Sequence, residues 1–583
     1  MRLLSCFVLG TFLGCTVAAA QTIYPVNRAD ILAGSRFDLK IEFPQALAAE
    51  PIAADKLKVS INGRDAAEVL GKAPVITLKE DDLPQTAYWI RDVALSSPGA
   101  YLVEATAGGA TSKVTWQVYG TKERRAKNVI LFIGDGMAVA HRTAARILSK
   151  GMIEGKYGGE LAMDDMPTMA LVSTAGTDSV ITDSANSMSA YTTGHKTCNN
   201  ALGVYCARNK SLLGHPRVEV ISTLAQRVHG MAVGVVTNSE IEDATPAGMV
   251  SQIRDRRAYN DIVRMFYDVA PDVIMGGGTP HFMPKSAPGS KRMDEEDYIK
   301  KFIDKGYKFV ATATEMKMTA AEAGTSKVLG LFNPGHIDGA LDLFVLKKGT
   351  VPRYPDQPDV VAQTKAALEI LSRSPKGFVL MVESARIDKY SHSLDWERAV
   401  FDTIMLDNAV KVAKDFAGTR DDTLIIVVPD HAHPVSLVGV FDDERPGQLP
   451  RDKLATYAAA KFPNYPAPNA DGYPSTVDVS RRLALMFGAY PDHCYSGKPY
   501  IEGEFIPAVK GPDDKTALAN EANCTPKTAR LFGNLPFEAL SGVHSGDDVI
   551  LTAMGPGSEI LRGRIDNTVV FRAMAQALGL APR

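Results

Sequence analysis

Two long apolar runs stand out in the central and C-terminal parts of the chain. They are the segments 128–133 and 423–429, and a third apolar segment leads into Val382-Glu383. Continuous runs of β-branched and other apolar residues are typical of strands buried on both faces of a mainly parallel sheet. The pattern therefore predicts an α/β domain in which helices flank such a sheet.

The part of the chain that follows residue 20 has a different pattern, in which apolar and polar residues mostly alternate. The alternating segments are 37–43, 57–61, 93–95, 101–105 and 114–118, and turns rich in Gly, Pro and Asp separate them. A period of two predicts half-buried strands, so we expect residues 21–120 to form an antiparallel, immunoglobulin-like β-sandwich. Packing against the rest of the chain and binding sugars or the cell surface are alternative roles for this sandwich.

The first twenty residues have a basic start, an apolar centre and a small-residue end. This is the pattern of an export signal cut near Ala20-Gln21, which predicts a periplasmic or secreted protein. Lipidation at Cys15 is the less favoured alternative, because the surrounding residues make a poor lipoprotein box. No later apolar run is long enough to span a membrane.

Composition narrows the choice of partners. The chain has 583 residues, enough for several domains, and a formal net charge of -3. Because this charge gives no basic surface for a polyanion, a dedicated nucleic-acid partner is not expected. A charged linker at 121–127 separates the sandwich from a predicted catalytic domain at 121–583.

Acidic and histidine residues follow each of the three apolar segments. Asp135 follows the segment 128–133. Glu383, Asp388 and His392 end or follow the apolar segment that leads into Val382-Glu383. The pair Asp430-His431 follows the segment 423–429. The carboxyl ends of strands are where open α/β sheets place ligand-binding groups. Carboxylates together with imidazoles suit zinc beside magnesium, although polar loop residues without a metal are the alternative for any one cluster.

A fourth segment offers a nucleophile. Ser184 follows Asp183 and precedes a helix-compatible run of small residues, so its hydroxyl is expected at a helix N-terminus, which favours anions such as phosphate. A capping serine without chemistry is the alternative. No Gly-x-Ser-x-Gly motif surrounds Ser184, which disfavours an ordinary esterase.

Together these motifs resemble those of the alkaline phosphatase family, in the same order, from about Asn128 to the C-terminus. The matching motifs are Asp135-Gly136-Met137, Thr143 to Arg146, Thr182 to Ala185 with Thr193-Gly194, Asp243 to Ala247, Arg256, Gly276 to Gly278, Val382 to His392, Asp430 to His433, and His544 with Gly546. The resemblance implies the fold of that family, with the sandwich as an addition to it.

The resemblance also implies a set of metal ligands for two Zn²⁺ and one Mg²⁺ per chain. One zinc would be held by Asp388, His392 and His544, and the second by Asp135, Asp430 and His431. Magnesium would be bound by Thr245 and Glu383, with Asp135 as a bridge to the second zinc.

The same resemblance implies the remaining site residues. Ser184 would be the catalytic nucleophile, and Asp183 and Arg256 would bind substrate, with the guanidinium holding two phosphate oxygens. Lys389 and Asp243 match the bacterial pattern, in which they surround phosphate and magnesium, whereas animal members carry histidines there. His433 matches a histidine that supports the ligands.

These residues predict metal-dependent hydrolysis of small phosphate monoesters through a phosphoserine intermediate. A phosphodiesterase or sulfatase of the same superfamily is the alternative among enzymes. The presence of Arg256 and of all the expected magnesium ligands disfavours both activities. A non-catalytic surface-binding protein is the alternative from another class, although no expected ligand is missing. The sequence leaves open the alcohol of the substrate and whether the chain forms a homodimer.

Four cysteines remain after the predicted signal. In an oxidising compartment Cys198 would pair with Cys206 and Cys494 with Cys524, although four cysteines allow three pairings.

More than a hundred residues separate His431 from His544. We expect a cap-like insertion at 434–540 that lies over or beside the metal cleft, or else serves stability or dimer contacts. The segment 285–363 is a second variable region that we expect to extend this cap.

Overall fold

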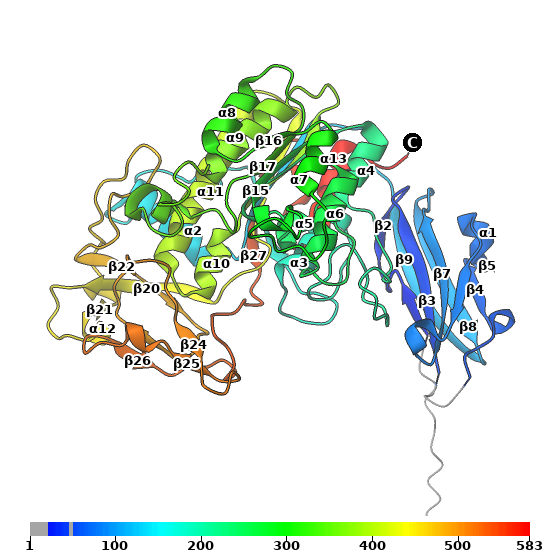
Figure 1. Ribbon diagram of the computed structural model, residues 1–583, viewed down its shortest axis with the longest axis horizontal. Helices are drawn as coiled ribbons and strands as arrows, with labels where there is room; N and C mark the ends of the chain where they lie inside the picture. Colours follow the sequence, from blue (N-terminus) through cyan, green and yellow to red (C-terminus); the bar gives the residue numbers. More distant parts are fainter. Residues whose placement is uncertain (1–20, 46–49, 583) are drawn as a thin grey trace, which may run out of the picture.

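The computed structural model describes residues 21–45 and 50–582 (Figure 1). The predicted export signal at 1–20, including the lipidation alternative at Cys15, lies outside the described residues. Figure 1 shows the N-terminal strands and the strands of the segment 434–540 at opposite ends of the molecule, with the central sheet and its helices between them.

A ten-stranded sheet forms the centre of the molecule. Its strands, in spatial order, are β16 (Lys308–Val310), β17 (Val328–Leu331), β15 (Val273–Gly277), β14 (Ala232–Glu240), β18 (Phe378–Ser384), β10 (Asn128–Gly134), β19 (Thr423–Val428), β27 (Val549–Met554), β13 (Thr168–Ser173) and β28 (Gly563–Asp566). Neighbouring strands run parallel except where β27 pairs with β19 and β13. The mainly parallel sheet predicted from the apolar runs is confirmed.

Helices cover both faces of this sheet, which explains why its central strands β10, β18 and β19 are buried at every position. One face carries α2 (Val139–Lys150), α9 (Val360–Leu371), α10 (Arg386–His392) and α11 (Trp396–Ala417). The other carries α3 (Ser184–Thr193), α4 (Ile221–His229), α6 (Tyr259–Val269) and α13 (Thr568–Leu578).

Two smaller sheets form the N-terminal part of the chain. One has the order β1 (Thr22–Tyr24), β3 (Phe37–Pro44), β7 (Gln85–Val93) and β6 (Val75–Leu78). The other has the order β2 (Asp30–Leu32), β9 (Ala110–Tyr119), β8 (Gly99–Ala107), β4 (Lys58–Ile61) and β5 (Arg64–Asp65). The expected β-rich region with antiparallel sheets is present, whereas its immunoglobulin-like type and its boundaries stay predictions.

One strand of this region differs from the sequence expectation. The segment 93–95 was predicted as a strand, but β7 spans Gln85–Val93 and contains only its first residue. Val93 and Leu95 are buried and Ala94 is exposed, so the expected alternation is present in 93–95. Leu95 nevertheless lies outside the strand, because its carbonyl accepts a hydrogen bond from the Gly34 N–H and the pairing of β7 with β3 ends at Val93.

The polar side chains of β3 are buried rather than exposed to solvent. Lys40 forms ion pairs with Glu42 at 3.0 Å and with Glu80 at 2.8 Å, and all three side chains are nearly inaccessible. The carboxylate of Glu42 also accepts a hydrogen bond from the backbone N–H of Arg208 at 2.7 Å. The N-terminal sheets therefore pack directly against the catalytic part of the chain, near the Cys198–Cys206 disulfide.

The segment 434–540 forms small sheets of its own outside the central sheet. These contain β20 (Val435–Asp442), β21 (Leu454–Ala455), β22 (Arg481–Phe487), β23 (His493–Tyr495), β24 (Ala508–Lys510), β25 (Ala517–Ala519) and β26 (Ala529–Leu531). The segment 285–363 was expected to extend this insertion. It instead supplies β16 and β17 at the edge of the central sheet. The expectation for 285–363 is to that extent wrong, and the reason is that short edge strands resemble loops in sequence.

The predicted cysteine pairing is confirmed by disulfides between Cys198 and Cys206 and between Cys494 and Cys524. A search of the described ranges, 21–45 and 50–582, finds no helix with the length and apolar character needed to cross a bilayer.

Candidate metal centre

Three adjacent strands bring the predicted acidic residues to one edge of the central sheet. Strand β10 lies between β18 and β19, and Ile133 of β10 is in register with Glu383 and with Val428. Because the three strands are parallel, the residues that follow them, including Asp135 and Asp430, emerge at the same edge. The apolar runs of the sequence thus position the acidic residues that follow them.

Helix α10 begins directly after β18 and carries two more predicted ligands. Asp388 and His392 are four residues apart, so they lie on the same side of the helix, with His392 Nε2 at 3.4 Å from Asp388 Oδ1. The start of the helix is fixed by Asn238, whose side-chain oxygen accepts a hydrogen bond from the Ala385 N–H at 2.7 Å. The carboxylate and the imidazole therefore face the sheet edge together.

His544 reaches the same place from the far end of the chain. The Gly542 N–H donates to the carbonyl of His392 at 2.8 Å, and the Ser545 N–H donates to the carbonyl of Ala432 at 2.9 Å. These two backbone hydrogen bonds hold the segment 542–545 between α10 and the residues after β19. Chain connectivity alone gives no hint of this position.

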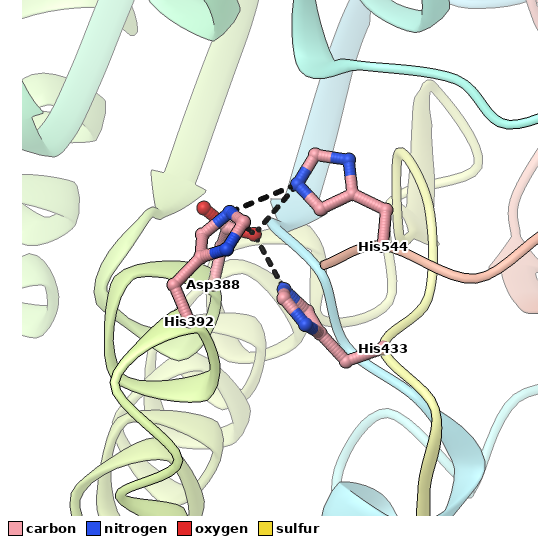
Figure 2. Close-up of side chains that lie close together, drawn as sticks. All are labelled: Asp388, His392, His433 and His544. Atoms are coloured by element: carbon pink, nitrogen blue, oxygen red, sulfur yellow. Dashed lines mark hydrogen bonds and ion pairs between the residues drawn. The ribbon is translucent and has the colours of Figure 1, made fainter. Parts of the chain in front are cut away.

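Three imidazoles surround one carboxylate oxygen of Asp388 (Figure 2). Oδ1 of Asp388 lies 2.7 Å from His433 Nε2, 3.3 Å from His544 Nε2 and 3.4 Å from His392 Nε2. These four residues offer ligand atoms that lie within 4.8 Å of one another. The arrangement has the size of a single metal coordination sphere.

The hydrogen bonds of two imidazoles show that their Nε2 atoms are available to a metal. His392 Nδ1 lies 2.6 Å from the carbonyl of Gly542, and His544 Nδ1 lies 2.9 Å from the carbonyl of Thr182. A carbonyl oxygen only accepts, so each Nδ1 must donate, and in the neutral ring Nε2 carries a lone pair. The two Nε2 atoms face each other at 3.0 Å, a contact that a bound metal ion, or a proton on one of the rings, makes favourable. The residues therefore fit a bound metal ion.

A second group lies around His431. Its Nε2 atom is 3.3 Å from Asp135 Oδ1, 3.4 Å from Asp430 Oδ2 and 4.0 Å from Asp388 Oδ1. The facing oxygens of Asp135 and Asp430 are buried and have no hydrogen-bond partner. Buried carboxylate oxygens without donors are costly unless a cation binds them, and oxygen with imidazole nitrogen is a donor set that suits zinc.

The crowding of charged groups in the centre shifts the pKa values of two carboxyl groups, Asp135 and Asp388. Burial, with the charges of Asp388 and Asp430 added to it, raises the pKa of Asp135 well above its usual range. Burial acts in the same direction on Asp388, but the neighbouring His392, His433 and His544 outweigh it and hold the pKa of Asp388 well below its usual range. One carboxylate is thus kept ionised, while another needs added positive charge to ionise.

Glu383 lies in a hydroxyl-rich pocket. Thr237 donates a short hydrogen bond to its Oε2, and Ser239 donates to the same atom at 3.4 Å. The hydroxyl of Thr245, which is predicted to share magnesium with Glu383, is buried without a hydrogen-bond partner. Hard oxygen donors of this kind suit magnesium.

Ser184 is the first residue of α3, and the preceding Asp183 is the residue that caps the helix. The Asp183 carboxylate accepts a hydrogen bond from the Ala185 N–H at 2.5 Å, so the Ser184 hydroxyl is not used as the cap. Its Oγ lies 3.4 Å from His431 Nε2 and is buried at the helix N-terminus. The Ser184 hydroxyl is therefore not the cap of this helix, whereas its catalytic role stays a prediction.

Two cations, Arg256 and Lys389, share the carboxylate of Asp243. Nη2 of Arg256 is 2.6 Å from Asp243 Oδ1, and Nζ of Lys389 is 3.0 Å from Asp243 Oδ2. Although burial opposes it, these two charges hold the pKa of Asp243 far below its usual range. Nη1 of Arg256 also lies 3.6 Å from Asp183 Oδ1, which points the guanidinium toward the start of α3.

Sequence reasoning missed the residues that orient the predicted ligands. Thr237, Asn238 and Ser239 form a polar end to β14, and they contact Glu383 and the start of α10. Their position after the apolar residues 232–236 is the signal that could have found them. Glu504 was also missed, and it accepts hydrogen bonds from Ser393 at 2.7 Å and from Arg386 at 3.2 Å.

Comparison with known proteins agrees with this geometry. The family model for alkaline phosphatase matches residues 126–580. An alkaline phosphatase from Gadus morhua is 29% identical over 490 residues, which cover 78% of this chain and 92% of the relative. The structure of Thermus thermophilus alkaline phosphatase superposes with a TM-score of 0.55 at 23% identity, covering 80% of this chain and 93% of that one.

A second solved structure is a mutant of the alkaline phosphatase from the Antarctic bacterium TAB5, described as having Mg bound in the M3 site. It has a TM-score of 0.51 at 21% identity and covers 78% of this chain and 99% of that one. The family match spans most of the chain and includes every residue of the candidate centre. The chain therefore belongs to the alkaline phosphatase family and hydrolyses phosphate monoesters.

Proposed function

We propose that this chain hydrolyses phosphate monoesters through a phosphoserine formed on Ser184. The observation that supports this most directly is the position of the Ser184 hydroxyl, at a helix N-terminus and 3.4 Å from an imidazole of the candidate metal centre. The hydroxyl is not used to cap the helix, and the backbone N–H groups and dipole of α3 favour a phosphoryl group at this point.

In the first half of the reaction the Ser184 oxygen forms a bond to phosphorus and the ester P–O bond breaks. The alcohol leaves with a proton, and the phosphoryl group stays on Ser184 at the start of α3. In the second half, water forms a bond to phosphorus, the bond to Ser184 breaks, and inorganic phosphate leaves. Each half transfers the group between two oxygens, so no oxidant or reductant is needed.

Arg256 is the residue that we propose binds the phosphoryl oxygens. Its guanidinium is directed at the start of α3 by Asp243 and Asp183, and its planar fork matches two oxygens of phosphate. Lys389 is fixed by the same Asp243 and adds a second positive charge to the surroundings of phosphate. Together they favour a dianionic monoester over the singly charged diesters and sulfate esters.

We also propose two zinc sites and one magnesium site per chain. Asp388, His392 and His544 would hold one zinc, and Asp135, Asp430 and His431 the other. Thr245, Glu383 and Asp135 would hold magnesium, a proposal that the Mg-bound TAB5 structure supports at the level of the fold. When bound, these metals supply Lewis acidity that neutralises the charge of the phosphoryl and leaving oxygens.

Steady-state rates on a phosphate monoester, a phosphate diester and a sulfate ester test the substrate class, with zinc and magnesium measured per chain in the same sample. We expect the monoester to be hydrolysed fastest, and at least two zinc ions and one magnesium ion to be found per chain. A faster diester or sulfate ester would contradict the role proposed for Arg256. Fewer than two zinc ions per chain, or no magnesium, would contradict the proposed sites.

We further propose that the enzyme acts in the periplasm or outside the cell. The two disulfides support this location, because such bonds persist in oxidising compartments. The signal-like pattern of residues 1–20 supports it independently. N-terminal sequencing of the mature protein should find Gln21 as the first residue.

A further inference from the structure

A third group of potential metal ligands lies at the carboxyl edge of the central sheet, and none of its members belongs to the proposed zinc or magnesium sites. It consists of Glu240, Glu242 and His281, whose ligand atoms lie within 4.8 Å of one another. Glu240 ends β14, Glu242 follows it in the turn before Asp243, and His281 ends the short helix η3 (Thr279–His281) after β15. Since β14 and β15 are parallel neighbours, these side chains meet at their ends.

Glu242 is the unusual member of this group. Its side chain is completely inaccessible to solvent, and neither carboxylate oxygen has a hydrogen-bond partner. Buried carboxylates almost always receive several hydrogen bonds, because an unpaired buried charge is strongly unfavourable. This side chain therefore lacks the partners that its burial demands.

His281 faces this carboxylate and is itself unsatisfied. Its Nε2 lies 3.3 Å from Glu242 Oε1, while its Nδ1 is buried without a partner. The backbone around it is fixed, because Arg292 donates to the His281 carbonyl at 3.0 Å. The ring is also held in place by Tyr259, which packs edge-on at a centroid distance of 5.0 Å.

The backbone is shaped to admit the carboxylate. Gly278 has a φ of 91°, and a Cβ at this position would lie 2.4 Å from Glu242 Oε2. Any other residue at 278 would displace the carboxylate in addition to being strained. Glycine at this position keeps the space in which Glu242 sits beside His281.

Positive charge near the group is limited. Nζ of Lys291 lies 3.4 Å from Glu240 Oε1, and Arg292 contacts the group through the His281 carbonyl. Asp243 adds a further negative charge nearby, although Lys389 and Arg256 hold it. Lys291 therefore pairs with Glu240, while no lysine or arginine among the described residues forms an ion pair with Glu242.

We propose that Glu240, Glu242 and His281 form a binding site for a further divalent transition-metal ion, with Zn²⁺ as the expected occupant. Two carboxylates and one imidazole are the ligand types of three-residue zinc sites, whereas a histidine ligand disfavours Ca²⁺ and Mg²⁺. A metal bound here would satisfy the carboxylate of Glu242 and tie the end of β14, which leads into Asp243 and Thr245, to η3.

A neutral pair is the competing explanation. Burial, followed by the charge of Glu240, raises the pKa of Glu242 well above its usual range, which favours the protonated form of this side chain when no metal is bound. A protonated Glu242 could donate to Nε2 of His281. That arrangement satisfies one atom of each side chain but leaves the second carboxylate oxygen of Glu242 and Nδ1 of His281 without partners.

Crystals of the holoenzyme equilibrated with Zn²⁺, measured above and below the zinc absorption edge, distinguish the two explanations. We expect an anomalous difference peak between the three side chains in addition to the peaks of the catalytic centre. Filled catalytic sites without such a peak, or with a lighter ion or water in its place, would overturn the proposal in favour of the protonated pair.

Elemental analysis of the same preparations gives a second measurement. Glu242→Gln and His281→Gln should each contain one zinc ion per chain fewer than wild type. Glu295→Gln is the matched control, because Glu295 lies on the neighbouring loop and only accepts a hydrogen bond from the Ser286 N–H. Equal zinc content in all four proteins would contradict the site, and the wild-type crystal decides the question even if one variant does not fold.

Discussion

Replacing Arg256 by alanine tests the proposed phosphate site most directly. In the structure the Arg256 guanidinium contacts two carboxylates, Asp243 at 2.6 Å and Asp183 at 3.6 Å. Asp243 keeps Lys389 at 3.0 Å in the variant, so it is not left without a counter-charge. We therefore expect Arg256→Ala to fold and to bind its metals, and to lose affinity for phosphate.

The size of the loss in phosphate affinity can be estimated from the hydrogen bonds that Arg256 is proposed to form with phosphate. A hydrogen bond to a charged group contributes about 1.5–3 kcal/mol, so a two-pronged contact with phosphate would contribute about 3–6 kcal/mol. In the free enzyme Asp243 already occupies one nitrogen of the fork, and this contact competes with phosphate. We therefore expect a net loss of about 2–4 kcal/mol, which is roughly a 30- to 700-fold rise in the dissociation constant of phosphate.

Competitive inhibition by inorganic phosphate is the appropriate assay. Arg257→Ala is the matched control, because Arg257 is adjacent in sequence, is largely exposed and pairs with Asp255 outside the centre. Arg256→Lys keeps the charge but lacks the planar fork, and should recover only part of the affinity. An inhibition constant for Arg256→Ala equal to that of Arg257→Ala would refute the proposed contact.

Four further variants test other parts of the centre. Ser184→Ala should lower turnover by about 10³-fold or more with both zinc ions retained, and a phosphoenzyme trapped on another residue would contradict this role. Glu383→Ala should lose magnesium first and become dependent on added Mg²⁺, whereas full magnesium content with near-normal turnover would exclude the metal role. Thr237→Val should weaken magnesium binding about 10- to 100-fold, with recovery in Thr237→Ser; equal affinities in the two variants would contradict the positioning role. Replacing Cys494 and Cys524 by serine opens a loop of 30 residues and should cost about 3–4 kcal/mol of unfolding free energy, measured by denaturant titration; an unchanged midpoint would contradict it.

Much of the central fold was predictable because burial on both faces of a sheet leaves a clear pattern. The runs 128–133 and 423–429 coincide with β10 and β19 almost residue for residue. The acidic residues that follow them were predictable for the same reason, since parallel strands deliver their carboxyl ends to one edge. The individual roles, by contrast, came from the resemblance to a family and not from the pattern.

The supporting contacts were not predictable, because they join segments that are far apart in sequence. Thr237 reaches Glu383 across 146 residues, and Glu504 reaches Ser393 across 111. Threonine and glutamate are common at strand ends and in loops, so their composition gives no signal. Glu242 was missed for a related reason, because a glutamate in a turn is usually exposed, and only the folded chain shows that this one is buried.

The hydrogen bonds around Asp388 separate the histidines that are suited to bind metal from the one that supports them. Asp388 stays ionised because the imidazoles around it outweigh the effect of burial on its pKa, so its oxygen only accepts hydrogen bonds. His433 Nε2 lies 2.7 Å from that oxygen and must therefore donate its proton there. His392 and His544 instead donate from Nδ1 to backbone carbonyls, and their Nε2 lone pairs face the centre. Proton positions alone thus favour His392 and His544 as ligands and His433 as the residue that orients Asp388.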